Sequence, residues 1–231
     1  MSTELHGVAI IGMSGRFPKA ESVSEFWTNV INKVDCIREL TIDEIIASGV
    51  DPELARSASY IKRAPLLDDI DKFDARFFDY LPKEASLLDP QSRMFLECVQ
   101  AALDDAGCDP DRYEGSIGVY AGTGLNNYLL KNLLRNPGIF EDVLDFTSVI
   151  SSDKDFLSTQ VNYKFNLRGP GITVQTACST SLVAIQMAFQ SLLTYQCDIA
   201  ISGGTHLRSP RAKGNPYKEG EIFSPDGYCR P

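Results

Sequence analysis

The stretch from Ile172 to Leu193 constrains the fold more than any other part of this 231-residue chain. It begins with the run Ile-Thr-Val-Gln at 172–175, passes through the small residues Thr-Ala-Cys-Ser-Thr-Ser at 176–181, and continues in a long apolar run. A β-branched run followed by a stretch of helical length predicts a strand that turns sharply into a helix. The helix at 182–193 is apolar on most sides, which is typical of a buried central helix.

Other segments continue this alternation of strand and helix. The short apolar runs at 8–12 and 117–122 each end in glycine and predict strands buried on both faces of a sheet, and 197–204 predicts another strand. Further helices are predicted at 24–34, 89–107 and 155–165. Strands that alternate with helices indicate an α/β fold with largely parallel pairing.

The sequence also predicts how two of these helices are capped and packed. Ser24 is placed to cap the helix at 24–34, while Asp89, Pro90 and Gly107 suit the two ends of the helix at 89–107. Large apolar residues recur at helical spacing in the first helix and predict a face buried in the core: Phe26, Trp27, Val30, Ile31 and Val34. The charged, irregular segment 35–81 predicts long loops with short helices.

Composition restricts the class of protein. With 43% hydrophobic and 23% charged residues the chain fits a globular protein, and a net charge of −9 argues against a nucleic-acid partner. No apolar run reaches the length of a membrane span and the first residues lack a signal-peptide pattern, so we expect a cytoplasmic protein. The six cysteines form no Cys-x-x-Cys pair and are expected to be reduced thiols. With only His6 and His206 available, no histidine-rich metal site is expected.

Cys178 is the candidate nucleophile, because the pattern places it where a strand turns into a helix. The backbone N–H groups and partial positive charge of a helix N-terminus favour a thiolate over a thiol. The same N–H groups could stabilise the oxyanion that forms when a thiolate attacks a thioester. Covalent acyl transfer is therefore reasonable chemistry, while the alternative is a small buried hydrophobic cysteine. The other five cysteines lack this setting and are expected to be structural.

Five ordered motifs resemble one family. The segment VQTACSTSLVAIQMA at 174–188 closely resembles the active-site segment of β-ketoacyl synthases, particularly the ketosynthase domains of modular type I polyketide synthases. Four further segments match in the same order: VAIIGMSGRFP, FDARFFDYLPKEASLLDPQSRMFLECVQAALDDAG, NYKFNLRGPGITV and EGEIFSPDGYCRP. The resemblance covers essentially the whole chain.

The resemblance implies a thiolase-like α/β fold, in which two related halves form an α-β-α-β-α layered core and residues 1–231 make up the N-terminal half. It also implies that Cys178 accepts an acyl chain and that a malonyl-type extender then undergoes decarboxylative Claisen condensation. The family's two catalytic histidines belong to the C-terminal half, and neither His6 nor His206 matches their motifs. We therefore expect condensation to need that half, in the same polypeptide or as a separate chain.

The same resemblance implies the partners. Acyl groups arrive on the phosphopantetheine of an acyl carrier protein, so no directly bound cofactor and no metal are expected, and homodimerisation is expected through the strand at 172–175. The product class is that of polyketide or fatty acid biosynthesis. Two alternatives remain open: a thiolase-like acyltransferase, and a noncatalytic chain-length or scaffold subunit that binds an active partner.

Overall fold

A computed structural model describes residues 7–136, 146–210 and 212–229 of the chain. Within this part, the chain divides into two compact units, one formed by 7–14 and 70–207 and the other by 15–69 and 208–229. His6 lies outside the described residues. Among the described residues, no helix is both long enough and apolar enough to cross a membrane.

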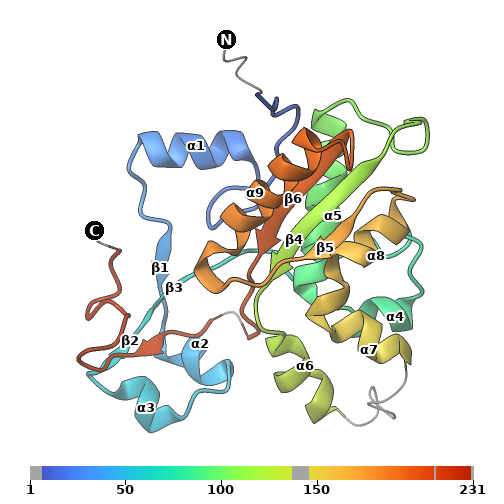
Figure 1. Cartoon of the computed structure of the whole chain (residues 1–231). Helices are drawn as coiled ribbons and strands as arrows, with labels where there is room; N and C mark the ends of the chain where they lie inside the picture. The colour runs from blue at the N-terminus through green and yellow to red at the C-terminus, as the bar shows by residue number, and fades with distance from the viewer. Residues whose placement is uncertain (1–6, 137–145, 211, 230–231) are drawn as a thin grey trace. The chain divides into compact units, whose positions relative to one another are not determined.

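A three-stranded parallel sheet forms the centre of the larger unit, with strand order β5-β4-β6 (Figure 1). Its strands are β4 (Ile117–Thr123), β5 (Gly171–Thr173) and β6 (Ile199–Thr205). Val119 of β4 lies opposite Gly171 on one side and Ile201 on the other. The predicted strands at 117–122, 172–175 and 197–204 are confirmed to within two residues, and so is parallel pairing.

Helices cover both faces of this sheet. The helical segments of the larger unit are α4 (Pro82–Leu87), α5 (Pro90–Asp105), α6 (Asn127–Lys131), η1 (Leu133–Arg135), α7 (Phe146–Ser152), η2 (Lys154–Phe156), α8 (Leu157–Lys164), η3 (Ala177–Ser179) and α9 (Thr180–Leu193). The predicted helix ends at 89–107 are confirmed: Asp89 accepts the N–H of Gln91 at 2.9 Å, and Gly107 has φ +62° after the last turn.

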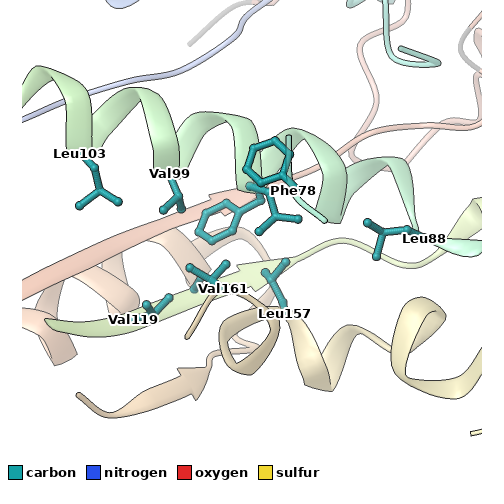
Figure 2. Close-up of a cluster of buried hydrophobic side chains, with 10 residues drawn as sticks. Phe78, Leu88, Val99, Leu103, Val119, Leu157 and Val161 are labelled. Carbon is teal, nitrogen blue, oxygen red and sulfur yellow. The ribbon is translucent and has the colours of Figure 1, made fainter. Parts of the chain in front are cut away.

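Successive residues of β4 point to opposite faces of the sheet and so belong to two different cores. Val119 joins side chains of α5 and α8, including Val99 and Val161, as Figure 2 shows. Tyr120 points the other way and packs with Ala184 and Ala188 of α9. The sheet is therefore the middle of three layers, with α9 on one face and α5 and α8 on the other.

The predicted strand at 8–12 is wrong. This segment pairs with no strand among the described residues, and Ile10 is 80% exposed. An apolar run becomes a strand only where a neighbouring strand satisfies its N–H and C=O groups. The segment instead packs on α5: a Cβ at Gly12 would lie 2.4 Å from the Ala102 carbonyl oxygen, and the Met13 N–H donates to Asp105.

The helix at 182–193 is confirmed as α9, but only one of its faces is buried within this chain. Ala184, Ala188 and Ser191 face the sheet, whereas Leu182 is 71% and Ile185 51% exposed. The small residues let the helix approach β4 and β6 closely, while Val183, Met187 and Leu192 pack at the edges of this contact. Within the described residues, the prediction of a buried central helix is therefore correct only for the face of α9 that packs on the sheet.

The smaller unit contains two antiparallel ribbons and three helices. Strand β1 (Ile37–Glu39) pairs with β3 (Arg63–Pro65), and β2 (Tyr60–Ile61) pairs with β7 (Asn215–Pro216). The helices are α1 (Val23–Ile31), α2 (Ile42–Ala47) and α3 (Pro52–Arg56). Short helices were predicted for this region, but the ribbons were not. Its core consists of Leu40, Ile45, Val50, Ala55, Tyr60 and Ala64.

Helix α1 corrects the prediction for 24–34 in two respects. Its N-cap is Ser22, whose side chain accepts the N–H of Glu25, so the helix starts before Ser24. No residue of α1 is buried, and Trp27 is 60% exposed. The helical spacing of its apolar residues is real, but spacing alone does not supply a surface for them to pack against.

Candidate active site at the β5–α9 turn

The candidate nucleophile lies in a tight turn between a strand and a helix. Cys178 belongs to η3, which follows β5 after a short connection and runs directly into α9. Its side chain is exposed. The predicted strand-to-helix setting is therefore present, and within the described residues Cys178 is not a buried cysteine.

The backbone of the turn adopts a conformation that L-residues avoid. Ala177, immediately before Cys178, has φ +52°. In this left-handed region the Cβ crowds the following carbonyl, at a cost of roughly 1 to 2 kcal/mol. Such a conformation persists only where surrounding contacts hold it, and it presents the next side chain at a sharp angle.

Hydrogen bonds from two hydroxyl groups close the turn. The Thr180 hydroxyl accepts the N–H of Thr176 at 3.0 Å and donates to the carbonyl of Ala177 at 2.8 Å. The Ser179 hydroxyl donates to the carbonyl of Thr176 at 2.8 Å. Side-chain to backbone bonds thus join the residues on both sides of Cys178.

Glycines on the neighbouring strands make room for this turn. A Cβ at Gly122 in β4 would lie 2.1 Å from the Val174 carbonyl oxygen and 2.3 Å from Cγ2 of Thr180. A Cβ at Gly204 in β6 would lie 2.8 Å from the Ser181 hydroxyl oxygen. The turn therefore sits against the carboxyl ends of two parallel strands, where open α/β sheets place their ligand sites.

The position of Cys178 suits attack on a thioester. No side chain caps η3 or α9, so the partial positive charge of the helix start is left to the turn that carries the thiol. The backbone N–H groups at this end of the helix can stabilise the oxyanion that forms when the sulfur attacks a thioester.

A buried contact fixes α9 to the sheet behind the site. The Tyr120 hydroxyl of β4 donates to the Ser191 hydroxyl of α9 at 2.5 Å, and Ser191 lies 3.4 Å from the Cys197 sulfur. Burial raises the pKa of Tyr120, so its hydroxyl stays a neutral donor. This contact sets the position of α9, and thereby of the turn at its start.

A buried glutamine joins the loops that follow β4 and β6. The Oε1 atom of Gln91 accepts the N–H groups of Gly124 at 3.2 Å and Leu207 at 3.1 Å, and its Nε2 donates to Asp89 at 2.9 Å. Burial raises the pKa of the Asp89 carboxyl, with its bonds to Gln91 acting in the opposite direction. Gln91 thus holds together the two strand ends nearest the turn.

The remaining candidates lie elsewhere. Cys197 is buried, Cys36, Cys98 and Cys108 are partly buried, and only Cys229 is exposed like Cys178. Cys229 lies in the smaller unit, outside any strand-to-helix turn. His206 follows β6 and lies beside Gly124, where a Cβ would come within 2.2 Å of its Nδ1 atom.

Sequence reasoning found Cys178 but missed the residues that shape its turn. Thr180 and Gly122 are small residues within otherwise regular patterns, and their roles depend on contacts between separate elements. Gln91 carried a weak signal, because a polar residue follows the cap and first-turn proline of a mainly apolar helix.

Comparison with known proteins gives one consistent family. A family model for the β-ketoacyl synthase N-terminal domain matches residues 6–231. A phenolphthiocerol/phthiocerol polyketide synthase from Mycobacterium tuberculosis is 46% identical, over 100% of this chain and 16% of its own length. The polyketide synthase PksL of Bacillus subtilis is 34% identical, over 98% of this chain and 5% of its own length. The chain thus spans a small part of these relatives.

Solved structures agree. Ketosynthase twelve of the bacillaene polyketide synthase from Bacillus amyloliquefaciens is similar with a TM-score of 0.82 and 29% identity, covering 95% of this chain and 38% of that one. The oxazolomycin ketosynthase domain from Streptomyces albus is similar with a TM-score of 0.72 and 32% identity, covering 87% of this chain and 34% of that one.

Proposed function

Because the chain belongs to the β-ketoacyl synthase family, whose N-terminal domain it contains, we propose that Cys178 accepts the acyl chain that the enzyme extends. Membership confirms the family inferred from the five motifs and, with it, the thiolase-like α/β fold. The observation that carries the proposal is the exposed thiol of Cys178 in the turn at the start of α9.

In the proposed acylation step, the Cys178 thiolate attacks the carbonyl carbon of an acyl thioester on the phosphopantetheine of an acyl carrier protein. A carbon–sulfur bond to Cys178 forms, and the bond to the phosphopantetheine sulfur breaks. The proton lost from Cys178 is recovered by the departing thiol, so no oxidant or reductant is needed. The helix start stabilises the negative charge on the sulfur and then on the oxygen.

Condensation would follow on a malonyl-type extender. Loss of carbon dioxide leaves a carbanion that attacks the acyl carbonyl on Cys178, forms the new carbon–carbon bond and releases the Cys178 thiolate. The family resemblance assigns this step to two histidines of a C-terminal half. We therefore propose that residues 1–231 can be acylated, but condense only together with that half.

Two exposed surfaces of the larger unit support the proposed partners, one on α9 and one at the edge of β5. The exposed Leu182 and Ile185 on α9 fit a cover of apolar side chains, which the C-terminal half would supply. Strand β5 pairs only with β4 among the described strands, so its free edge is open to homodimerisation. Ile172 on this edge is 38% exposed. Analytical ultracentrifugation of the protein joined to its C-terminal half would test the dimer, and an Ile172→Lys variant should weaken it.

Acylation is tested by mass spectrometry after exposure to an acyl thioester on a carrier protein. We expect one acyl group per chain, located on Cys178, and none in a Cys178→Ala variant. Cys229→Ala is the matched control, because it removes the other exposed thiol. Acylation from acetyl-coenzyme A but not from a carrier would favour the thiolase-like alternative, and absence of acylation would favour a noncatalytic scaffold subunit.

The need for the C-terminal half has its own test. Residues 1–231 are assayed for β-ketoacyl product with acyl and malonyl carrier proteins, alone and with the added half. Product formed at full rate by this chain alone would contradict the proposal.

Cytoplasmic location is likewise proposed, and fractionation of the cells that produce the protein tests it.

A further inference from the structure

We propose that Thr180 is a positioning residue, whose hydroxyl holds the turn before Cys178 in the shape that presents the thiol for attack. This inference rests on the proposed role of Cys178 as the acyl acceptor. It concerns a side chain two residues away that does not itself take part in bond making.

The hydroxyl of Thr180 spans the turn from both sides. It accepts the N–H of Thr176 at 3.0 Å and donates its single proton to the carbonyl of Ala177 at 2.8 Å. The backbone N–H of Thr180 also donates to that carbonyl. One side chain therefore ties together the two residues that precede Cys178.

The turn needs this support because of Ala177. Its φ of +52° lies in the left-handed region, which is unfavourable for a residue with a Cβ. Without the Thr180 hydroxyl bonds, the Ser179 hydroxyl and the backbone bonds are left to hold the peptide between Thr176 and Ala177, which then relaxes more easily toward an ordinary conformation. Since Cys178 follows directly, that relaxation moves its sulfur away from the position set by the start of α9.

The methyl group of Thr180 orients the hydroxyl. Its Cγ2 atom lies against Gly122, close enough that a Cβ there would come within 2.3 Å. A β-branched side chain packed in this way has little rotational freedom, so its hydroxyl is held between its two partners. The hydroxyl and the methyl group can be removed separately, as Thr180→Val and Thr180→Ser.

The matched pair separates positioning from packing. We expect Thr180→Val, which keeps the branched shape but loses both hydroxyl bonds, to slow acylation of Cys178 by an octanoyl-N-acetylcysteamine thioester about 10- to 100-fold. Thr180→Ser keeps the hydroxyl, so its acylation rate should stay within about threefold of that of the unchanged protein. This should hold even if its unfolding temperature falls as far as that of Thr180→Val. Equal rates for Thr180→Val and the unchanged protein, or equal slowing by both variants, would overturn the inference.

A second variant tests the role of strain. Glycine adopts the left-handed region freely, so adding Ala177→Gly to Thr180→Val should restore the rate about threefold or more. No recovery in the double variant would contradict the mechanism. If Thr180→Val does not fold, the rate retained by Thr180→Ser still decides, because a large loss there contradicts the proposal.

The same variants distinguish this inference from the proposed function. If the unchanged protein is not acylated at Cys178, the proposed function fails. Alkylation of Cys178 by iodoacetamide, followed by mass spectrometry with Cys229→Ala as background, then still reports the position of the thiol. A slower rate for Thr180→Val than for Thr180→Ser would support the positioning role, and equal rates would refute it.

Discussion

In the larger unit, the turn that carries Cys178 packs against two glycines with no space for a methyl group and is closed by hydroxyl groups, whereas in the smaller unit the segments around Arg63 are joined by a charged side chain. Gly122 and Gly204 meet the turn so closely that a Cβ would fall within 2.8 Å of it. In the smaller unit, Arg63 donates to Asp35 and to the carbonyls of Ile37 and Gly227.

The two kinds of contact differ in what they tolerate. Close packing is insensitive to salt and pH, but it cannot absorb an added atom. Ion pairs with an exposed partner, such as Asp35, contribute little individually, yet they respond to protonation. The turn at Cys178 combines close packing with hydroxyl bonds, while the segments around Arg63 are joined through its guanidinium.

The largest expected effect comes from filling the space beside the turn. Gly122→Ala should lower the free energy of unfolding by roughly 3 kcal/mol or more and abolish measurable acylation of Cys178, since its Cβ would overlap a backbone carbonyl. Chemical denaturation measures the free energy of unfolding, and mass spectrometry measures the acylation. Gly203→Ala is the control, because its Cβ would meet only a Phe95 ring atom at 3.5 Å. Similar losses of stability and acylation in Gly122→Ala and Gly203→Ala would contradict the role of close packing at the turn.

A change in the core of the smaller unit should affect stability without affecting the thiol. Ile45 is fully buried, and Ile45→Ala should cost roughly 2 to 3 kcal/mol through lost contacts and a cavity. Hydrogen exchange should show lost protection in α2 and α3, while the iodoacetamide rate of Cys178 stays within about twofold. A tenfold slower reaction of Cys178 would show that the smaller unit also shapes the turn.

Removing a helix cap in the smaller unit should have a smaller effect. Asp51 accepts the N–H groups of Glu53 at 2.9 Å and Leu54 at 3.0 Å at the start of α3. Asp51→Ala should cost about 1 kcal/mol, and Asp51→Asn, which retains a capping oxygen, should cost less. Denaturation midpoints of the two variants measure the difference, and equal midpoints would argue against the cap.

The smallest expected effect is a pH response of the smaller unit. The hydrogen bond from Arg38, with those from Thr41, lowers the pKa of Glu44 from 4.5 to about 2. Because the folded state holds the carboxylate, its contribution to stability is present above about pH 4.5 and is lost as the pH falls toward about 2. In Glu44→Gln, the free energy of unfolding should therefore change less with pH over this range.

Asp43→Asn is the control for that measurement, because it removes a charge of the same sign from the same helical turn. Denaturation curves at several acidic pH values would show the difference. If the free energy of unfolding of Glu44→Gln depends on pH as it does in the unchanged protein, the role of the Arg38 contact is contradicted.

Asp89 in the larger unit should act in the opposite sense. Its pKa is raised by burial, so its contribution favours the folded state at low pH and is lost as the pH rises through that pKa.

Local patterns were sufficient for three elements of the larger unit. The apolar run of β4, the capped helix α5 and the strand-to-helix change at Cys178 are each defined by neighbouring residues, and all three are present. Local patterns failed where an element needs a distant partner. The run at 8–12 has the composition of a strand but pairs with none of the described strands, and α1 has an apolar face but no buried residue.

The sequence by itself determined the family, the α/β class and the candidate nucleophile, because these depend on motif order and on residue types that lie next to one another in the chain. Only the tertiary structure decided how the turn at Cys178 is held. Gly122 lies far from Thr180 in sequence, yet its missing side chain leaves the space that Thr180 occupies. Contacts of this kind arise when separate strands and helices meet, so no local pattern encodes them.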